Sequence, residues 1–320
     1  MMGGGGQTTA ERGRRRDRLT IMAVVLVTSV FPVEPFPGAP RDLRGTDGQF
    51  SGKQGQVIVV RLPVEGEPSA DDPIEVEGRF LGRTIPFFPA QASSGGRYVG
   101  LLGIDLQDAP GTHELAVRVK SAGRTKRLSY NVLVIKHSYP VQRLTLPKDK
   151  VDLDERSLVR VKAEQQQVRS VLDHVTRERL WAGDFVEPVH GPIAGSFGQA
   201  RIINGRPRNP HNGEDISAPP GTEVVATNDG IVRLTVDHFF SGKGIYLDHG
   251  LGLYSMYFHL SEITVRDGEE VKRGQVIGRV GASGRVSGPH LHWAVRLNGA
   301  RVDPYALLTL SFAEEAAGRP

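Results

Sequence analysis

The order of apolar and polar residues along the chain predicts a β module in its first half. From Gln56 to Lys136, short runs of alternating apolar and polar residues are separated by turn signals such as Asp108–Gly111 and Ser121–Gly123. The predicted strands are Gln56–Leu62, Ile74–Glu77, Tyr98–Ile104, His113–Lys120 and Arg127–Ile135. Strands at this regular spacing favour an immunoglobulin-like sandwich, which we assign to residues 54–137. The module contains no catalytic constellation, so we expect it to act in binding or as a spacer.

The pattern becomes helical between Asp154 and Glu178. Apolar residues recur there at spacings of three and four, namely Leu158, Val161, Val168, Val171, Leu172 and Val175. This spacing places them on one face of a helix, and the charged and Gln residues between them would face water. We therefore expect residues 138–182 to be a connector that contains one helix.

From Phe185 to Leu310 the pattern is again typical of strands. Gly221–Ala226 and Gly230–Val232 predict a strand, a tight turn and a second strand. Val265–Gly278 resembles the hairpins of biotin- and lipoyl-carrier domains, which makes a barrel-sandwich carrier or adaptor an alternative to an enzyme. Lys272 lacks the Met-Lys setting of a modified lysine, so this similarity concerns the β-architecture and not the function.

The N-terminus predicts export. A basic cluster at Arg12–Arg18 precedes an apolar run from Leu19 to Phe31, which ends at Pro32. A basic flank before a short apolar core is typical of a signal peptide, and the run is shorter than the roughly 20 residues that span a bilayer. We interpret residues 1–32 as an export signal, either cleaved or retained as a membrane anchor. Residues 33–53, rich in Pro, Gly and Asp, are expected to be a flexible tether, and residues 311–320 a C-terminal tail.

Composition narrows the functional classes. The 320 residues include no cysteine, which excludes disulfides, thiolate zinc sites and a cysteine nucleophile. The net charge of +4 would help the protein associate with an anionic cell wall or membrane. The sequence has no aromatic-plus-basic motif of the kind that RNA-binding sheets use, so no nucleic-acid partner is expected.

Two histidine motifs carry the candidate chemistry. His290 and His292 are two residues apart, so on a strand both imidazoles point to one face. A hydrolytic zinc site needs three protein ligands and one position left open for water. His211 and Asp215 offer a nitrogen and a carboxylate oxygen, and Gly213 between them argues for a loop.

Residues from about Val189 to Leu307 resemble the lysostaphin/LytM-type zinc endopeptidases, which cut the peptide bridges of bacterial cell walls. The matching motifs, in order, are Ser196–Gly198, His211–Ile216, Gly221–Ala226, Asp229–Val232, Asp248–Gly250, Tyr257–Leu260 and Gly284–His292. Ala294 is a departure, because the family often has an acidic residue there, and this affects only the expected substrate contacts.

The resemblance implies a mainly antiparallel β, barrel-sandwich-like peptidase domain over residues 183–310. It also implies a Zn²⁺ ion held by His211, Asp215 and His292, with His259 and His290 as catalytic residues that handle protons and steady the oxyanion. The expected substrates are peptidoglycan stem or cross-bridge peptides. The expected location is the bacterial cell envelope, periplasmic or extracellular, with the anchor as an alternative. A catalytically inactive scaffold that activates another wall hydrolase is the competing function, but such proteins lose metal ligands that this chain retains. The oligomeric state stays open.

Overall fold

The computed structural model describes residues 49–64, 73–90, 97–121, 123–145, 153–194 and 196–310. The expected export signal, most of the expected tether and the expected C-terminal tail lie outside the described residues. Within the described ranges, no helix combines the length and the apolar character that a membrane crossing requires.

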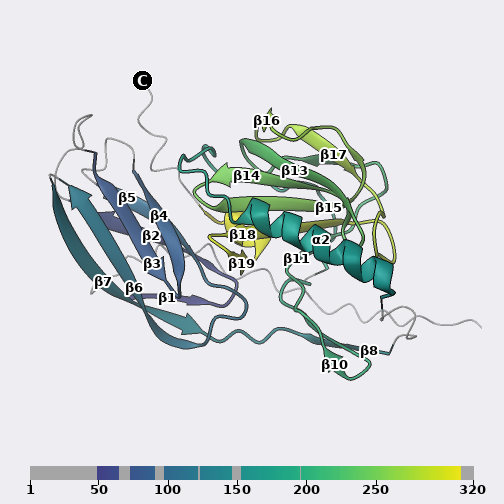
Figure 1. Cartoon of the computed structure of the whole chain (residues 1–320), viewed down its shortest axis with the longest axis horizontal. Coiled ribbons are helices and arrows are strands. Elements are labelled where there is room, and N and C mark those ends of the chain that lie inside the picture. Colours follow the sequence, from purple (N-terminus) through teal and green to yellow (C-terminus); the bar gives the residue numbers. More distant parts are fainter. Residues whose placement is uncertain are drawn as a thin grey trace, which may run out of the picture. The chain divides into compact units, whose positions relative to one another are not determined.

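The N-terminal module is a β-sandwich (Figure 1), as the alternating pattern predicted. Its strands follow the order β1-β7-β6-β3-β4-β5-β2. Their bounds are β1 Gln49–Lys53, β2 Val57–Pro63, β3 Glu75–Phe80, β4 Arg83–Pro89, β5 Arg97–Gly103, β6 Gly111–Ser121 and β7 Arg124–Ile135. In β2, buried Ile58, Val60 and Leu62 alternate with more exposed residues, so one face of the strand packs into the core.

The boundary of the tether needs a correction. Residues 49–53, which the Pro- and Gly-rich composition placed in the tether, form β1 and pair in parallel with β7. Phe50 is buried in the sandwich core. A Cβ on Gly52 would lie 2.9 Å from the Ile104 side chain, so a glycine occupies the second inward position. Since glycine gives no apolar signal, the alternation of this strand could not be recognised in the sequence.

The connector contains a small sheet and the predicted helix. Strand β8 (Val141–Leu144) pairs in parallel with β9 (Ala200–Ile203), which pairs with β10 (Arg206–Pro207). Helix α2 spans Glu155–Leu172, and its N-cap Asp154 accepts the backbone N–H of Ser157 at 2.7 Å. The helix ends six residues before the predicted Glu178, with Asp173 as C-cap. Val175, which the helical pattern included, is 47% exposed.

The C-terminal module is a twisted sheet of nine strands in the path β11-β18-β15-β14-β13-β16, with β12, β17 and β19 pairing beside it. The bounds are β11 Gly213–Ile216, β12 Glu223–Val225, β13 Gly230–His238, β14 Gly242–Gly250, β15 Leu253–Ile263, β16 Glu270–Val271, β17 Val276–Val280, β18 Leu291–Leu297, β19 Ala300–Val302 and the short helix α3 Pro304–Leu308. The paired strands of this sheet run antiparallel, as expected for the peptidase-like domain.

The two faces of this sheet are covered differently. One face carries Tyr257, Trp293 and Val295 into the main core. On the other, Met256, Phe258 and Ala294 pack with the apolar side of α2, which lies across the front of the sheet (Figure 1). The helix therefore covers residues of β13 to β15 and Ala294 of β18, whereas β11 contributes no residue to this cluster.

The sandwich contacts the C-terminal module through β5 and the segment that follows it. Arg301 Nε donates to Asp105 Oδ2 at 2.8 Å, and both side chains are largely buried. Val99 and Leu101 belong to the same core as Leu297 and Val302. The first module is thus packed against the C-terminal sheet by an ion pair and by shared apolar contacts.

Candidate metal and catalytic site

The pairing of β11 with β18 brings the two histidine motifs together. These strands are antiparallel, and Asp215 lies directly opposite His292. His211 immediately precedes β11, and its ring centroid lies 4.6 Å from that of His292. Two segments about 80 residues apart in sequence therefore contribute to one cluster on the uncovered edge of the sheet.

Three side chains in this cluster offer ligand atoms for a metal ion. Asp215 Oδ1 lies 3.4 Å from His211 Nε2 and 2.8 Å from His292 Nδ1. All three ligand atoms lie within 4.8 Å of one another. Tetrahedral zinc, with bonds of about 2.0–2.1 Å, separates its ligand atoms by about 3.3 Å. The donor set and its spacing fit a zinc ion, so these residues could bind a metal.

Electrostatics favour an ionised Asp215. Burial by itself would raise the pKa of this carboxyl group, but its interactions with the His211 and His292 side chains outweigh burial and hold the pKa well below its usual range. The carboxylate is therefore charged at neutral pH, as a metal ligand must be.

His211 is oriented by the loop that contains the Ser196–Gly198 motif. Its Nδ1 lies 3.1 Å from the carbonyl oxygen of Ser196. A carbonyl can only accept, so Nδ1 carries the proton and Nε2 keeps its lone pair toward Asp215. The buried Glu214 carboxylate accepts the backbone N–H groups of Ser196 at 2.6 Å and Phe197 at 3.2 Å. Glu214 was not among the predicted site residues, yet it holds in place the Ser196–Phe197 loop that orients His211.

Gly213 makes room for His292. A Cβ at this position would lie 2.6 Å from the Trp293 carbonyl oxygen and 2.7 Å from His292 Nε2. Any side chain there would push against the imidazole or the paired strand. Gly213 of the first motif is therefore required because Trp293 and His292 of the second motif lie so close to it. The sequence could not show this relation.

His290 and His259 lie beside the three candidate ligands. Their ring centroids are 4.8 Å apart, and His290 Nε2 lies 3.6 Å from Asp215 Oδ1. In each ring, Nδ1 donates to a backbone carbonyl: His290 to Gly288 at 2.9 Å and His259 to Ser283 at 3.0 Å. Both rings therefore keep an unprotonated Nε2 when neutral.

The backbone of His259 is unusual for a strand residue. Its φ is +64°, in the left-handed region, and the pairing of β15 with β14 changes register between the partners of Lys243 and Ile245. Such a bulge redirects a side chain relative to its neighbours. Burial lowers the pKa of His259 to about 4, so the ring is neutral at pH 7.

Ala294, the departure from the family pattern, lies opposite Gly213 in the pairing of β11 and β18. It is 1% exposed and packs with Met256 and Phe258 in the cluster that α2 covers. A small apolar residue at this position suits the packing of the helix onto the sheet.

Comparisons with known proteins identify the family of this chain. The model of peptidase family M23 matches residues 209–304, a range that contains all five histidine and aspartate residues of the cluster. The crystal structure of a Pseudomonas aeruginosa protein assigned to peptidase M23 superposes with a TM-score of 0.62 at 30% identity, covering 80% of this chain and 95% of that one. The chain belongs to peptidase family M23.

Curated relatives are similar over the same region. The peptidoglycan DD-endopeptidase ShyA of Vibrio cholerae is 44% identical over 94 residues, which are 29% of this chain and 22% of ShyA. The DD-carboxypeptidase/endopeptidase Mpg of Neisseria meningitidis is 39% identical over 97 residues, or 30% of this chain and 22% of Mpg. The chain thus matches about a fifth of the length of these relatives.

Proposed function

We propose that the protein is a zinc-dependent endopeptidase that hydrolyses peptide bonds in peptidoglycan stem or cross-bridge peptides. The observation that carries this proposal is the convergence of His211, Asp215 and His292 with two further imidazoles at one edge of the sheet. Membership of family M23, and relatives described as peptidoglycan DD-endopeptidases, support the substrate class.

Each side chain has a role that follows from its geometry. A zinc ion held by His211, Asp215 and His292 would activate a water molecule and polarise the scissile carbonyl. His259 and His290 keep Nδ1 protonated by donation to a carbonyl, which leaves Nε2 free to take or give a proton. Each free Nε2 can therefore accept a proton during attack and return it to the leaving amine.

The competing function, an inactive scaffold that activates another wall hydrolase, has less support. A scaffold has no need to keep three metal-ligand side chains, two proton-handling imidazoles and the glycine that makes room for them. In this chain each of these groups is present, and they lie close together. Hydrolysis of peptidoglycan also requires access to the cell envelope, which the expected N-terminal export signal would provide.

Metal analysis combined with digestion of purified wall sacculi tests the proposal. We expect about one zinc per chain and release of peptide fragments identifiable by mass spectrometry. Asp215→Ala should lose the metal and reduce hydrolysis by about 10³-fold or more, because two imidazoles make a poor site. Asp237→Ala, an exposed aspartate on β13, is the matched control. Full zinc content in Asp215→Ala would refute the ligand assignment, and a zinc-loaded wild type that leaves sacculi intact would favour the scaffold.

A further inference from the structure

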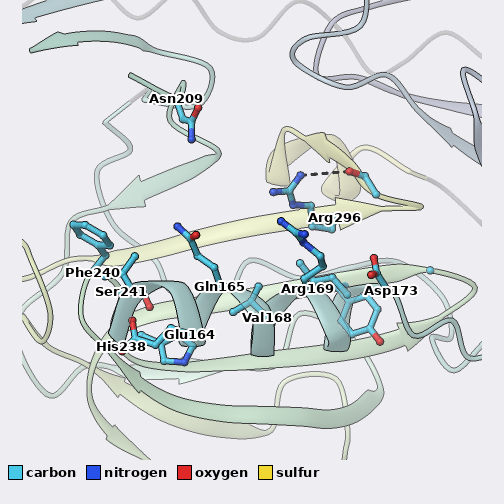
Figure 2. A pocket seen from close by; sticks show the side chains of 15 residues that line it. Glu164, Gln165, Val168, Arg169, Asp173, Asn209, His238, Phe240, Ser241 and Arg296 are labelled. Carbon is cyan, nitrogen blue, oxygen red and sulfur yellow. Dashed lines mark hydrogen bonds between the residues drawn. The ribbon is translucent and has the colours of Figure 1, made fainter. Parts of the chain in front are cut away.

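A second feature beside the histidine cluster is a cavity of about 640 Å³ between α2 and the sheet (Figure 2). Its walls come from α2, from the turn between β13 and β14, from the loop before β11 and from the end of β18. The residues that matter for its chemistry are Glu164, Gln165, Arg169, Asp173, Asn209 and Arg296.

The cavity begins beside the candidate metal site. Asn209, in its wall, lies two residues before His211, and the carbonyl of Ser241 accepts the backbone N–H of His259 at 3.0 Å. Arg296 lies four residues after His292 on β18, so both side chains project from the same face of the strand. Four strand residues span about 13 Å, which is the length of about four residues of an extended peptide.

Helix α2 is a fixed wall of this cavity. Its Val168, Val171 and Leu172 pack against the cluster that contains Ala294. Arg160 Nη2 donates to the Asp237 carbonyl at 2.8 Å, and the Glu164 carboxylate accepts the Phe239 N–H at 3.1 Å. Apolar packing and hydrogen bonds therefore hold the helix over β13 to β15, while β18 beside it borders the cavity.

Two guanidinium groups face the cavity. Figure 2 shows Arg169 of α2 and Arg296 of β18 extending into the same space. Burial lowers the pKa of Arg296 to about 10, so it remains charged at neutral pH. Arg296 Nη1 donates a long hydrogen bond, of 3.3 Å, to the Gly299 carbonyl. Within the described ranges, neither Arg169 nor Arg296 forms an ion pair.

Two acidic groups near this charge, Glu164 in the wall and Asp105 near Arg296, are already paired with other arginines. The Glu164 carboxylate is occupied by Arg160 at 2.7 Å and by the Phe239 N–H. Asp173, at the C-terminus of α2, is exposed. A guanidinium binds a carboxylate through two parallel hydrogen bonds, and partial burial strengthens such a pair.

We propose that this cavity is an arm of the substrate groove, in which Arg296, assisted by Arg169, binds a free carboxylate of the peptide two to four residues from the scissile bond. This inference rests on the proposed function. It also makes that function more specific, because it assigns an acidic peptide as the substrate. It also gives α2, which lies outside the region matched by the family model, a direct part in substrate binding.

The test compares two forms of one cross-linked muropeptide, with its free carboxylates intact or converted to carboxamides. Wild-type protein should cleave the carboxylate form with a KM about 10- to 100-fold lower, as expected for a charged hydrogen-bonded pair. Arg296→Gln should lose this preference through a higher KM for the carboxylate form, and Arg169→Gln should lose part of it. Arg156→Gln, the same change on α2 outside the cavity, should keep the preference.

Calorimetric binding of a labelled, non-cleavable peptide in the same two forms separates this proposal from the proposed function. Binding that depends on the carboxylate and on Arg296 would support the groove even in a protein that cleaves neither form. Equal binding of the two forms by wild type, or equal discrimination by wild type and Arg296→Gln, would overturn it. Faster cleavage of both forms by the arginine variants would also overturn it, because α2 would then be an obstruction.

Discussion

The buried His249 and the half-buried histidines of the candidate site differ in how many of their ring nitrogens are hydrogen-bonded. His249 uses both nitrogens: Nδ1 donates to the Asp229 carbonyl at 2.7 Å, and Nε2 accepts from Ser255 Oγ at 2.7 Å. Ser255 in turn bonds to the Tyr257 hydroxyl, which accepts the Thr227 N–H. His211, His259 and His290 instead satisfy only Nδ1 with a carbonyl.

This difference separates a structural histidine from a candidate functional one. His249 is 0% exposed, and its ring has no lone pair left for chemistry. His211 and His290 each direct Nε2 toward Asp215, and His292 directs Nδ1 toward the same carboxylate. Burial alone does not distinguish the groups, since His292 is also buried. What distinguishes them is the number of nitrogens that the fold already uses.

Among the variants that test this difference between His249 and the candidate functional histidines, His290→Ala is expected to have the largest effect. This variant should retain its zinc and lose about 10²–10⁴-fold in the rate of muropeptide hydrolysis, because it lacks one proton-transfer group. Metal content and turnover are measured on the same preparation. His190→Ala, whose side chain is 93% exposed, is the control. If zinc were lost together with activity, His290 would be a ligand and its assignment would have to be exchanged with that of His292.

A smaller effect is expected from Glu214→Gln. The amide would present N–H groups toward the backbone N–H donors of Ser196 and Phe197, which would loosen the loop that orients His211. We expect zinc affinity to fall about 10- to 100-fold, measured by competition with a chelator. Glu223→Gln on β12, an exposed position, serves as control. Unchanged affinity would show that the loop does not position His211.

The smallest effect concerns the pH dependence of stability at His249. Burial lowers its folded-state pKa to about 4, below the unfolded value of 6.5. The unfolded state therefore binds more protons between these values, so the stability contribution is complete above about pH 6.5 and is lost as the pH falls toward 4. Between pH 7 and 5.5 the loss should be about 1 kcal/mol.

The measurement is the difference in unfolding free energy between wild type and His249→Gln across this pH range. Contributions from other titrating groups, including Asp303, whose pKa burial raises to about 6, are common to both proteins and cancel. The difference between the proteins should narrow as the solution is acidified. A difference that does not change with pH would show that His249 is already protonated in the folded state or is solvated.

The sequence alone predicted the sandwich, the helix within residues 154–178, the strand-rich C-terminal region and the residues of the histidine cluster. Alternation and helical periodicity report burial on one face of an element, and short motifs keep their spacing in the chain. For this reason β2 and most of α2 fell where the pattern placed them, whereas β1 did not, because Gly52 fills an inward position without an apolar side chain.

Only the tertiary structure decided which nitrogen of each ring is free, why Gly213 must lack a side chain, and that Glu214 supports the loop beside His211. These properties depend on contacts between segments that are distant in sequence, such as the register that places Asp215 opposite His292. The cavity beside α2 has the same origin, because Arg169 and Arg296 meet only when the helix docks across the sheet. Periodicity indicates that α2 has an apolar face, but it carries no information about which strands that face will cover.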